Sequence, residues 1–236
     1  MKKYIYLIII LIFTINLFSL NIVTSIKPLE LITKELVPDA NITTIYENSD
    51  SFFNLKIDSK DFNNVDLFVV LDKEIILSEN SKSVVLSEGV LFYPYKENPF
   101  IWTDPLYTVV IAYKIEKKLE SISPENANEF RNNLLNFTQK LVDLSDSFSK
   151  IIKDKKINIL DINETFIHFY KRYNIKYATL GEDETITKDK ILVYNINYDD
   201  STFDNLKNKK ILVDIFASQY DDIINFYKTI IDALIN

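Results

Sequence analysis

Residues 124–153, which read PENANEFRNNLLNFTQKLVDLSDSFSKIIK, decide the fold of this chain. Apolar side chains recur there at spacings of three and four residues, from Phe130 and Leu134 to Phe148 and Ile152. This spacing predicts one long amphipathic helix that begins at Pro124, because a proline is tolerated in the first turn of a helix. Such a helix is too long to be a single crossover in a small sheet, so we expect a spine that runs along two lobes.

The segments on either side of this helix alternate between strand and helix patterns. N-terminal to it, the predicted strands are 21–26, 42–46, 66–71 and 82–86, and the predicted helices are 28–36, 58–64 and 108–119. C-terminal to it, the predicted strands are 157–162, 176–180, 191–196 and 210–215, with helices at 164–173, near 204 and from 218 onward. Alternation of this kind predicts parallel sheets. We therefore expect an α/β fold in which two α/β lobes with parallel sheets are joined by the spine helix, with a ligand cleft between the lobes.

The N-terminal residues have the pattern of an export signal. Lys2 and Lys3 precede an apolar run over residues 4–18, and Ser19 offers a small side chain for cleavage. An uncleaved N-terminal anchor is the alternative. The predicted divisions are a signal peptide over 1–19, an N-terminal lobe over 20–104, a helical hairpin and spine helix over 105–154, and a C-terminal lobe over 155–236. We expect an exported protein, periplasmic or otherwise extracytoplasmic.

Composition excludes several kinds of site. The chain has no cysteine and one histidine, so disulfides and thiolate metal sites are excluded and any metal must be held mainly by oxygen. A net charge of −7 argues against nucleic-acid binding, and two isolated glycines cannot form a phosphate-binding loop. The paired carboxylates are adjacent in sequence and no nucleophile motif is present, so we do not expect an enzyme.

Several short motifs, taken in order, resemble the solute-binding proteins of zinc and manganese ABC transporters. They are the opening Val23-Thr-Ser-Ile-Lys-Pro-Leu29, then Trp102-Thr-Asp-Pro105, Ser123-Pro-Glu-Asn126 with Phe130-Arg-Asn-Asn-Leu134, and the aromatic helix from Phe166 to Tyr173. That family has His-x-Trp-x-Asp-Pro at the second of these places. The resemblance covers nearly the whole chain after the signal and implies a two-lobed binding protein that works with a membrane permease.

The family binds its metal through three side chains that are usually histidine and through a C-terminal carboxylate. By resemblance, the four positions fall on Ser51, Phe100, Asn163 and Asp214, so only the carboxylate is kept. Oxygen ligands of this kind suit manganese, magnesium or calcium better than zinc. The alternative for Asn163 is a helix-capping role. Glu47, Asp50 and Glu164 are further oxygen donors near the expected cleft.

The remaining candidates have plainer interpretations. His168 lies within the helix after Asn163, at a position that is aromatic in the family, so we expect a packed helix residue. We expect Trp102 to be structural and Asp104 to cap the following helix. An aromatic group that could line a cleft for an organic ligand comprises Phe92, Tyr93, Tyr95 and Phe100.

These observations predict an extracytoplasmic solute-binding protein of a metal-ion ABC transporter with a degenerate metal site. Its expected partners are a membrane permease and a divalent ion such as manganese or zinc, or no ion at all, and we expect a monomer that binds no nucleic acid. The alternative is an exported interaction scaffold that is derived from the same family and binds no metal. A binder of organic ligands is a third possibility.

Overall fold

The structure is a computed structural model, and it describes residues 19–48, 52, 57–72, 75–78, 82–88, 98–180, 186–196 and 205–236. The predicted signal over 1–19 falls almost wholly outside these ranges. Asp50, Ser51, the aromatic residues Phe92, Tyr93 and Tyr95, and the centre of the helix predicted near 204 also lie outside them. Within the described ranges, no helix is both long enough and apolar enough to cross a membrane.

The N-terminal lobe is built on a parallel sheet of four strands in the order β2-β1-β4-β6. Helix α2 follows β1 without a break, and Pro28 lies in its first turn. A two-stranded parallel pair, β3 with β5, adjoins this sheet and was not predicted from the sequence. The elements are β1 (Asn21–Ile26), α2 (Lys27–Leu36), β2 (Asn41–Tyr46), β3 (Ile57–Asp58), a 3₁₀ turn (Ser59–Asp61), β4 (Leu67–Val70), β5 (Ile75–Ile76) and β6 (Ser83–Val85).

The C-terminal lobe repeats this plan with a second parallel sheet, in the order β10-β9-β7-β8. Its elements are β7 (Asn158–Asp161), α6 (Ile167–Arg172), β8 (Lys176–Thr179), β9 (Ile191–Asn195), β10 (Lys210–Val213) and α7 (Ile223–Ile235). The two parallel sheets, with helices between their strands, confirm the predicted α/β fold.

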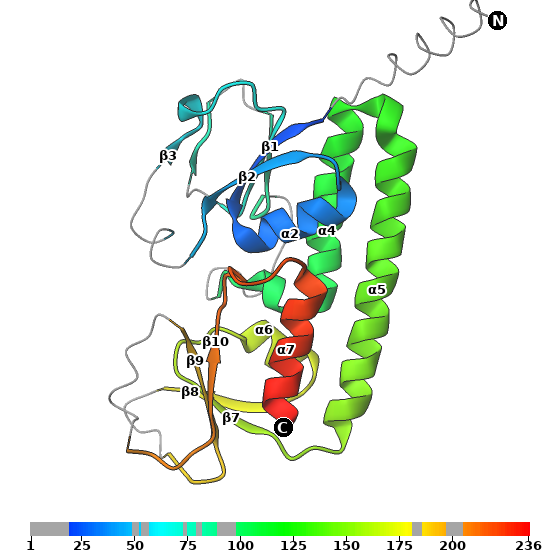
Figure 1. Cartoon of the computed structure of the whole chain (residues 1–236). Coiled ribbons are helices and arrows are strands. Elements are labelled where there is room, and N and C mark those ends of the chain that lie inside the picture. Colours follow the sequence, from blue (N-terminus) through cyan, green and yellow to red (C-terminus); the bar gives the residue numbers. More distant parts are fainter. Residues whose placement is uncertain are drawn as a thin grey trace, which may run out of the picture.

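The spine is a hairpin of two long helices beside both lobes (Figure 1). A 3₁₀ turn at Ile101–Thr103 leads into α4 (Pro105–Ile122), and a second turn at Pro124–Asn126 leads into α5 (Ala127–Lys153). Helix α5 packs against α4, against α2 of the N-terminal lobe and against α7 of the C-terminal lobe. The predicted apolar stripe, which also includes Ile151, is buried except at that residue, whose side chain is exposed: the buried members are Phe130, Leu134, Phe137, Leu141, Leu144, Phe148 and Ile152.

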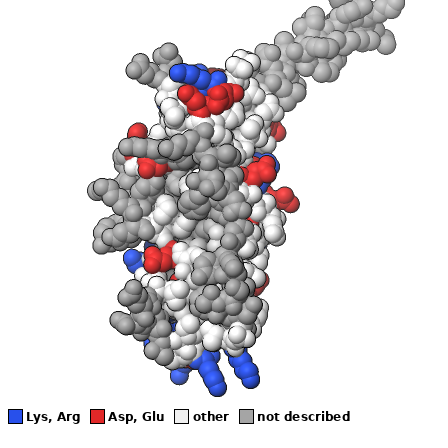
Figure 2. All heavy atoms as spheres, turned by 90° about the vertical axis from the view of Figure 1, so that its left-hand side faces the viewer, with Lys and Arg blue, Asp and Glu red and all other residues white. Residues whose placement is uncertain are grey.

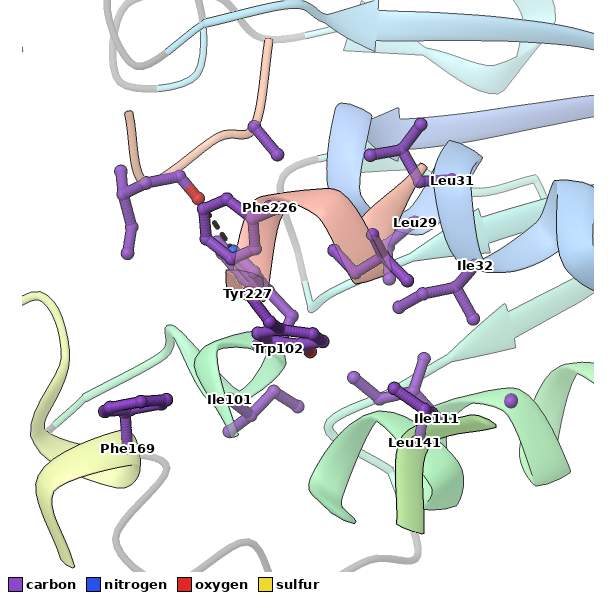
Figure 3. Close-up of a cluster of buried hydrophobic side chains, with 14 of the residues drawn as sticks. Leu29, Leu31, Ile32, Ile101, Trp102, Ile111, Leu141, Phe169, Phe226 and Tyr227 are labelled. Carbon is purple, nitrogen blue, oxygen red and sulfur yellow. Dashed lines mark hydrogen bonds between the residues drawn. The ribbon is translucent and has the colours of Figure 1, made fainter. Parts of the chain in front are cut away.

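The two lobes share one hydrophobic core instead of having two separate ones. A continuous cluster of buried side chains includes Leu29 of α2, Trp102 before α4, Phe169 of α6 and Phe226 of α7. In Figure 3, Trp102 lies beside Phe226 and Tyr227, with Leu29, Leu31 and Ile32 on one side and Phe169 on the other. Because this core crosses the lobe junction, the relative position of the lobes is part of the packed structure.

Several helix predictions were wrong in their limits: the helix predicted over 164–173 spans only Ile167–Arg172, and the one predicted over 108–119 extends over Pro105–Ile122. The segment 58–64 forms only the single turn Ser59–Asp61, which is closed by Asp58 and Asp61 in a capping box. The last helix begins at Ile223 and not at 218, because Asp222 caps it with a side-chain bond to the amide of Asn225 (2.7 Å). The residues between β10 and α7 form a turn at the lobe junction.

Candidate functional site

The carboxyl ends of strands from the two sheets meet at the junction between the lobes. Strand β1 ends there at Ile26 and continues into α2, and the segment after β10 reaches toward α2 before α7 turns back (Figure 1). In parallel α/β proteins, ligands bind beyond the carboxyl ends of the strands. This junction is therefore the candidate binding site.

Trp102 ties the segment before α4 to the C-terminal lobe. Its side chain is fully buried, and its indole Nε1 donates to the carbonyl of Ile215 just after β10 (2.8 Å). The carbonyl of Trp102 in turn accepts from the hydroxyl of Tyr227 on α7 (2.6 Å), which also bonds to Thr108 on α4 (2.6 Å). These bonds satisfy the buried polar atoms and confirm the structural role predicted for Trp102.

A series of aromatic rings crosses the lobe junction. Phe52, which follows β2, packs on Tyr46 in its own lobe (ring centroids 5.6 Å apart) and on Phe216 in the C-terminal lobe (5.4 Å). Phe216 then packs on Trp102 (6.1 Å), and Trp102 on Phe100 (5.6 Å, nearly perpendicular). We call Phe52, Phe100, Trp102 and Phe216 the junction aromatics. They fill the centre of the junction with apolar side chains.

Asp214 lies directly after β10 and its carboxylate organises the turn that follows. Oδ1 accepts from the amide of Phe216 (3.1 Å), and Oδ2 accepts from the amide of Ser218 (2.6 Å) and from its hydroxyl (2.5 Å). The Asp214 side chain is largely buried. The carboxylate therefore holds Phe216 in the position where this ring contacts Phe52.

Asn163 lies just after β7, at the same edge of the sheet. Its Oδ1 accepts from the amide of Asn195 at the end of β9 (2.9 Å), and Asn195 Oδ1 accepts from the amide of Ile215 (3.4 Å). Asn163 after β7 and Asp214 after β10 thus lie on either side of the end of β9, where Asn195 links Asn163 to Ile215, the residue after Asp214. The alternative of a helix cap at Asn163 is not what the structure has, since α6 begins only at Ile167 and its N-cap is Phe166.

A polar hollow of about 630 Å³ opens between the N-terminal lobe and Ser218, the residue whose amide and hydroxyl donate to Asp214. Its lining from α2 includes Glu30, whose carboxylate bonds to Lys27 (2.7 Å) and to the hydroxyl of Thr44 (2.5 Å). Burial raises the pKa of the Glu30 carboxyl, but these two hydrogen bonds together with the charges of Lys27 and Lys34 outweigh it, so the pKa is lowered overall. Glu47 and Asn48 line the outer part. Across the described ranges, no group of three or more His, Asp or Glu side chains is placed to hold a metal.

His168 and Asp104 lie behind the junction and have the structural roles that the sequence predicts. His168 is buried, its Nε2 is 2.9 Å from the carbonyl oxygen of Asn98, and its ring packs on Tyr107. Asp104 caps α4 through the amide of Leu106 (2.8 Å) and pairs with the guanidinium of Arg172 (2.8 Å). Neither side chain points into the junction as a ligand would.

The sequence comparison decides the family. The family model for the periplasmic zinc-uptake complex component A, ZnuA, matches residues 22–191, which is most of the chain. The chain belongs to the ZnuA family. This confirms the family that the sequence motifs predict.

Curated relatives of this ZnuA-family chain are named as substrate-binding lipoproteins of metal ABC transporters or as a putative metal-binding protein. The manganese ABC transporter substrate-binding lipoprotein PsaA of Streptococcus pneumoniae is 30% identical over 119 residues, which is 46% of this chain and 38% of that protein. A putative metal-binding protein of Thermotoga maritima is 26% identical over 194 residues, covering 77% of this chain and 71% of its own length. The stretch matched in PsaA is thus well under half of that relative.

Solved structures show the same fold at low identity. A zinc-bound deletion mutant of ZnuA superposes with a TM-score of 0.75 at 15% identity, over 92% of this chain and 97% of the other. The zinc-bound ZnuA-like domain of AdcA from Streptococcus pneumoniae gives 0.70 at 15% identity, over 92% and 100%. These likenesses establish the two-lobed fold.

Sequence reasoning missed Asn195, Ser218 and the contact between Phe52 and Phe216. Asn195 had a usable signal, since it is a polar residue at the carboxyl end of a predicted strand. The sequence predicts that Ser218 begins the last helix, and this prediction gives no reason to expect a hydrogen bond from Ser218 to Asp214. Phe52 and Phe216 are far apart in the sequence, and nothing in either segment indicates the other.

Proposed function

We propose that this ZnuA-family protein is the extracytoplasmic solute-binding component of a metal-ion ABC transporter, with a cargo site that differs from that of its relatives. The observation that carries the proposal is the position of Phe100, Asn163 and Asp214. These three family-equivalent residues lie at or beside the lobe junction, although only Asp214 has the chemistry of a strong metal ligand. The scaffold is kept while the donor set has changed.

The donors at the junction are oxygens. The Asp214 carboxylate, the Asn163 amide and the side chains of Glu47, Asn48 and Ser218 around the polar hollow offer carboxylate, amide and hydroxyl groups. Hard cations such as manganese, magnesium and calcium prefer such ligands, whereas zinc favours imidazole and thiolate. We therefore infer that the cargo is a hard divalent cation, and that Ser51 contributes a hydroxyl from the segment before Phe52.

The same proposal assigns a place and a partner to the chain. The positively charged and apolar start of the sequence supports export, with the two lobes outside the cytoplasm. A monomer would deliver its cargo to a membrane permease. The shared core between the lobes supports delivery by a small change in lobe geometry instead of a wide hinge opening.

Calorimetric titration of the demetallated protein with manganese, zinc, calcium and magnesium tests this function. We expect manganese to bind more tightly than millimolar, and Asp214→Asn and Glu47→Gln each to weaken it at least tenfold. Asp189→Asn is the matched control, because Asp189 is an exposed carboxylate at the amino end of β9, away from the junction. Thermal unfolding of each variant shows whether the fold is kept, which matters for Asp214 because it also organises a turn. Binding no tighter than millimolar in the unmodified protein, or binding that Glu47→Gln and Asp214→Asn leave unchanged, contradicts the proposal.

A second function is favoured by the junction aromatics. An apolar centre of the junction suits a protein that keeps its lobes closed and presents a fixed surface to another protein. In that case none of the four ions changes the unfolding temperature of the demetallated chain. Permease genes beside the gene for this chain favour transport, and their absence favours the interaction scaffold.

A further inference from the structure

The amino ends of the strands in the C-terminal sheet carry an unusual share of the chain's lysines. Exposed lysines precede or begin each strand: Lys155 and Lys156 before β7, Lys176 at β8, Lys188 before β9, and Lys207 and Lys209 before β10. All of these side chains are exposed. Because the four strands are parallel, their amino ends lie at one edge of the sheet, opposite the edge that faces the lobe junction.

Hydrogen bonds join these segments into one continuous surface. Asn158 at the start of β7 donates to the carboxylate of Asp189 (2.8 Å). Asn208 donates to the carbonyls of Thr187 and Lys190, both at 2.8 Å. In Figure 2, Lys and Arg side chains project from the lower end of the molecule, which is the end of the C-terminal lobe. We call this surface, together with Lys153 in the last turn of α5, the basic end.

The basic end contains a hollow of about 790 Å³. Its charged lining comprises Lys153, Lys155, Lys156, Lys176 and Arg172, and the one carboxylate among its lining residues is Asp189. Asp189 is already held by Thr187 (2.5 Å) and Asn158. Within the described part of the chain, none of the four lysines forms an ion pair, whereas Arg172 is bound to Asp104. The ammonium groups are therefore available to a ligand.

We infer that this hollow binds an anion that carries several phosphate groups. The available cations are lysine ammonium groups, which act as point charges and suit charge that is spread over several phosphates. The volume lies within the range of small-molecule sites, about 300 to 1,000 Å³. The excess of positive charge is also local to this surface, since the chain as a whole has a net charge of −7. The one aromatic side chain in the lining, Tyr173, is buried, which disfavours stacking of a nucleic-acid base.

Titration of the full chain with sodium tripolyphosphate tests the inference. We expect saturable binding that sodium chloride of matched ionic strength does not reproduce and that weakens as salt is added, because exposed charges are screened. The triple variant Lys155→Gln, Lys156→Gln, Lys176→Gln should bind at least tenfold more weakly. The control is Lys60→Gln, Lys82→Gln, Lys228→Gln, which removes the same charge from exposed lysines elsewhere and should bind as the unmodified chain does.

A second measurement separates a soluble phosphate compound from a lipid headgroup. Sedimentation with vesicles of anionic phospholipid is compared with vesicles of phosphatidylcholine, and the Lys155, Lys156 and Lys176 variant, which keeps Lys2, Lys3 and the apolar run after them, shows how much binding comes from the N-terminal residues. A preference for anionic vesicles that the Lys155, Lys156 and Lys176 variant loses supports a headgroup as the source of phosphate. Tripolyphosphate binding without that preference supports a soluble anion. The inference is overturned if neither probe binds, or if both triple variants behave alike. These outcomes are independent of manganese binding at the junction.

Discussion

At the scale of single residues, one carboxylate stabilises two elements at once. Asp104 is buried, caps α4 through the amides of Leu106 (2.8 Å) and Tyr107 (3.4 Å), and forms bonds of 3.0 and 2.8 Å with Nε of Arg172 on α6. We expect Asp104→Ala to lower the free energy of unfolding by about 3 kcal/mol, because it removes the cap and leaves Arg172 without its partner. Urea denaturation measures this loss.

The comparison for that experiment is an ion pair on the surface. Arg131 pairs with Glu120 between α5 and α4, and its side chain is half exposed. Exposed pairs contribute roughly 0 to 1 kcal/mol, so Arg131→Ala should cost less than about 1 kcal/mol. Equal losses from the two variants would show that Asp104 has no special role.

His168 makes the folding stability of the chain depend on pH in the mildly acidic range. Burial lowers the pKa of its imidazole, and Lys171 acts in the same direction, while the carbonyl of Asn98 and the charge of Asp104 oppose the shift. The unfolded chain then takes up a proton near pH 6.5, about the ordinary pKa of histidine, and the folded chain does so only at lower pH. Stability is therefore expected to fall as pH drops below about 6.5 toward the folded pKa.

Since His168 is the only histidine in the sequence, proton NMR gives a single imidazole titration in each state. The folded protein should titrate at lower pH than the urea-unfolded chain. His168→Gln should remove this part of the pH dependence of unfolding. A folded titration at or above the unfolded one would contradict the expected sign.

At the scale of elements, the start of α7 depends on one side chain. Asp222 precedes Ile223 and bonds to the amide of Asn225 (2.7 Å), whereas the neighbouring Asp221 is exposed and has no part in the cap. Loss of such a cap costs about 1 kcal/mol. We expect Asp222→Ala to lower the unfolding free energy by that amount and Asp221→Ala to change it by less than about 0.5 kcal/mol. Thermal and urea unfolding of the two variants test this, and equal effects would rule out the cap.

Element prediction succeeded where a pattern repeats and failed where a turn is held by side chains. The stripe from Phe130 to Ile152 on α5 repeats over many turns, so its period alone locates the helix. The residues after β10 have no apolar pattern that repeats at helical spacing. There the hydrogen bonds that the amide and hydroxyl of Ser218 donate to Asp214, and the positive φ of Ala217 (51°), keep the chain out of a helix until Ile223. The pair β3 and β5 has only two residues in each strand, too few for any alternation to be visible.

At the scale of the whole molecule, the sequence predicts a cleft between two lobes but does not show which side chains fill the junction. Phe100, Asn163 and Asp214 were placed near a cleft because strand ends and family motifs mark those positions. Their actual surroundings depend on contacts between distant segments, such as Phe52 with Phe216 and Trp102 with Ile215. Such pairings come from tertiary packing, which neither local periodicity nor a motif records.

The junction aromatics also make the closure of the lobes measurable. Phe52 is the ring of the N-terminal lobe that packs on Phe216, and Phe216 packs on Trp102, which is the one tryptophan in the chain. Phe52→Ala should loosen this contact, cost about 2 kcal/mol and shift Trp102 emission to longer wavelength, because water reaches a ring that is otherwise fully buried. Phe62→Ala is the control, since Phe62 is likewise half-buried but packs on Phe68 within the N-terminal lobe (6.1 Å). The Phe62→Ala variant should be less stable, but its Trp102 emission should stay at the wavelength of the unmodified chain. If Phe52→Ala leaves the emission unchanged, the junction aromatics do not hold the lobes together. In that case the shared core and the hydrogen bond from Trp102 to Ile215 are sufficient to keep the lobes closed.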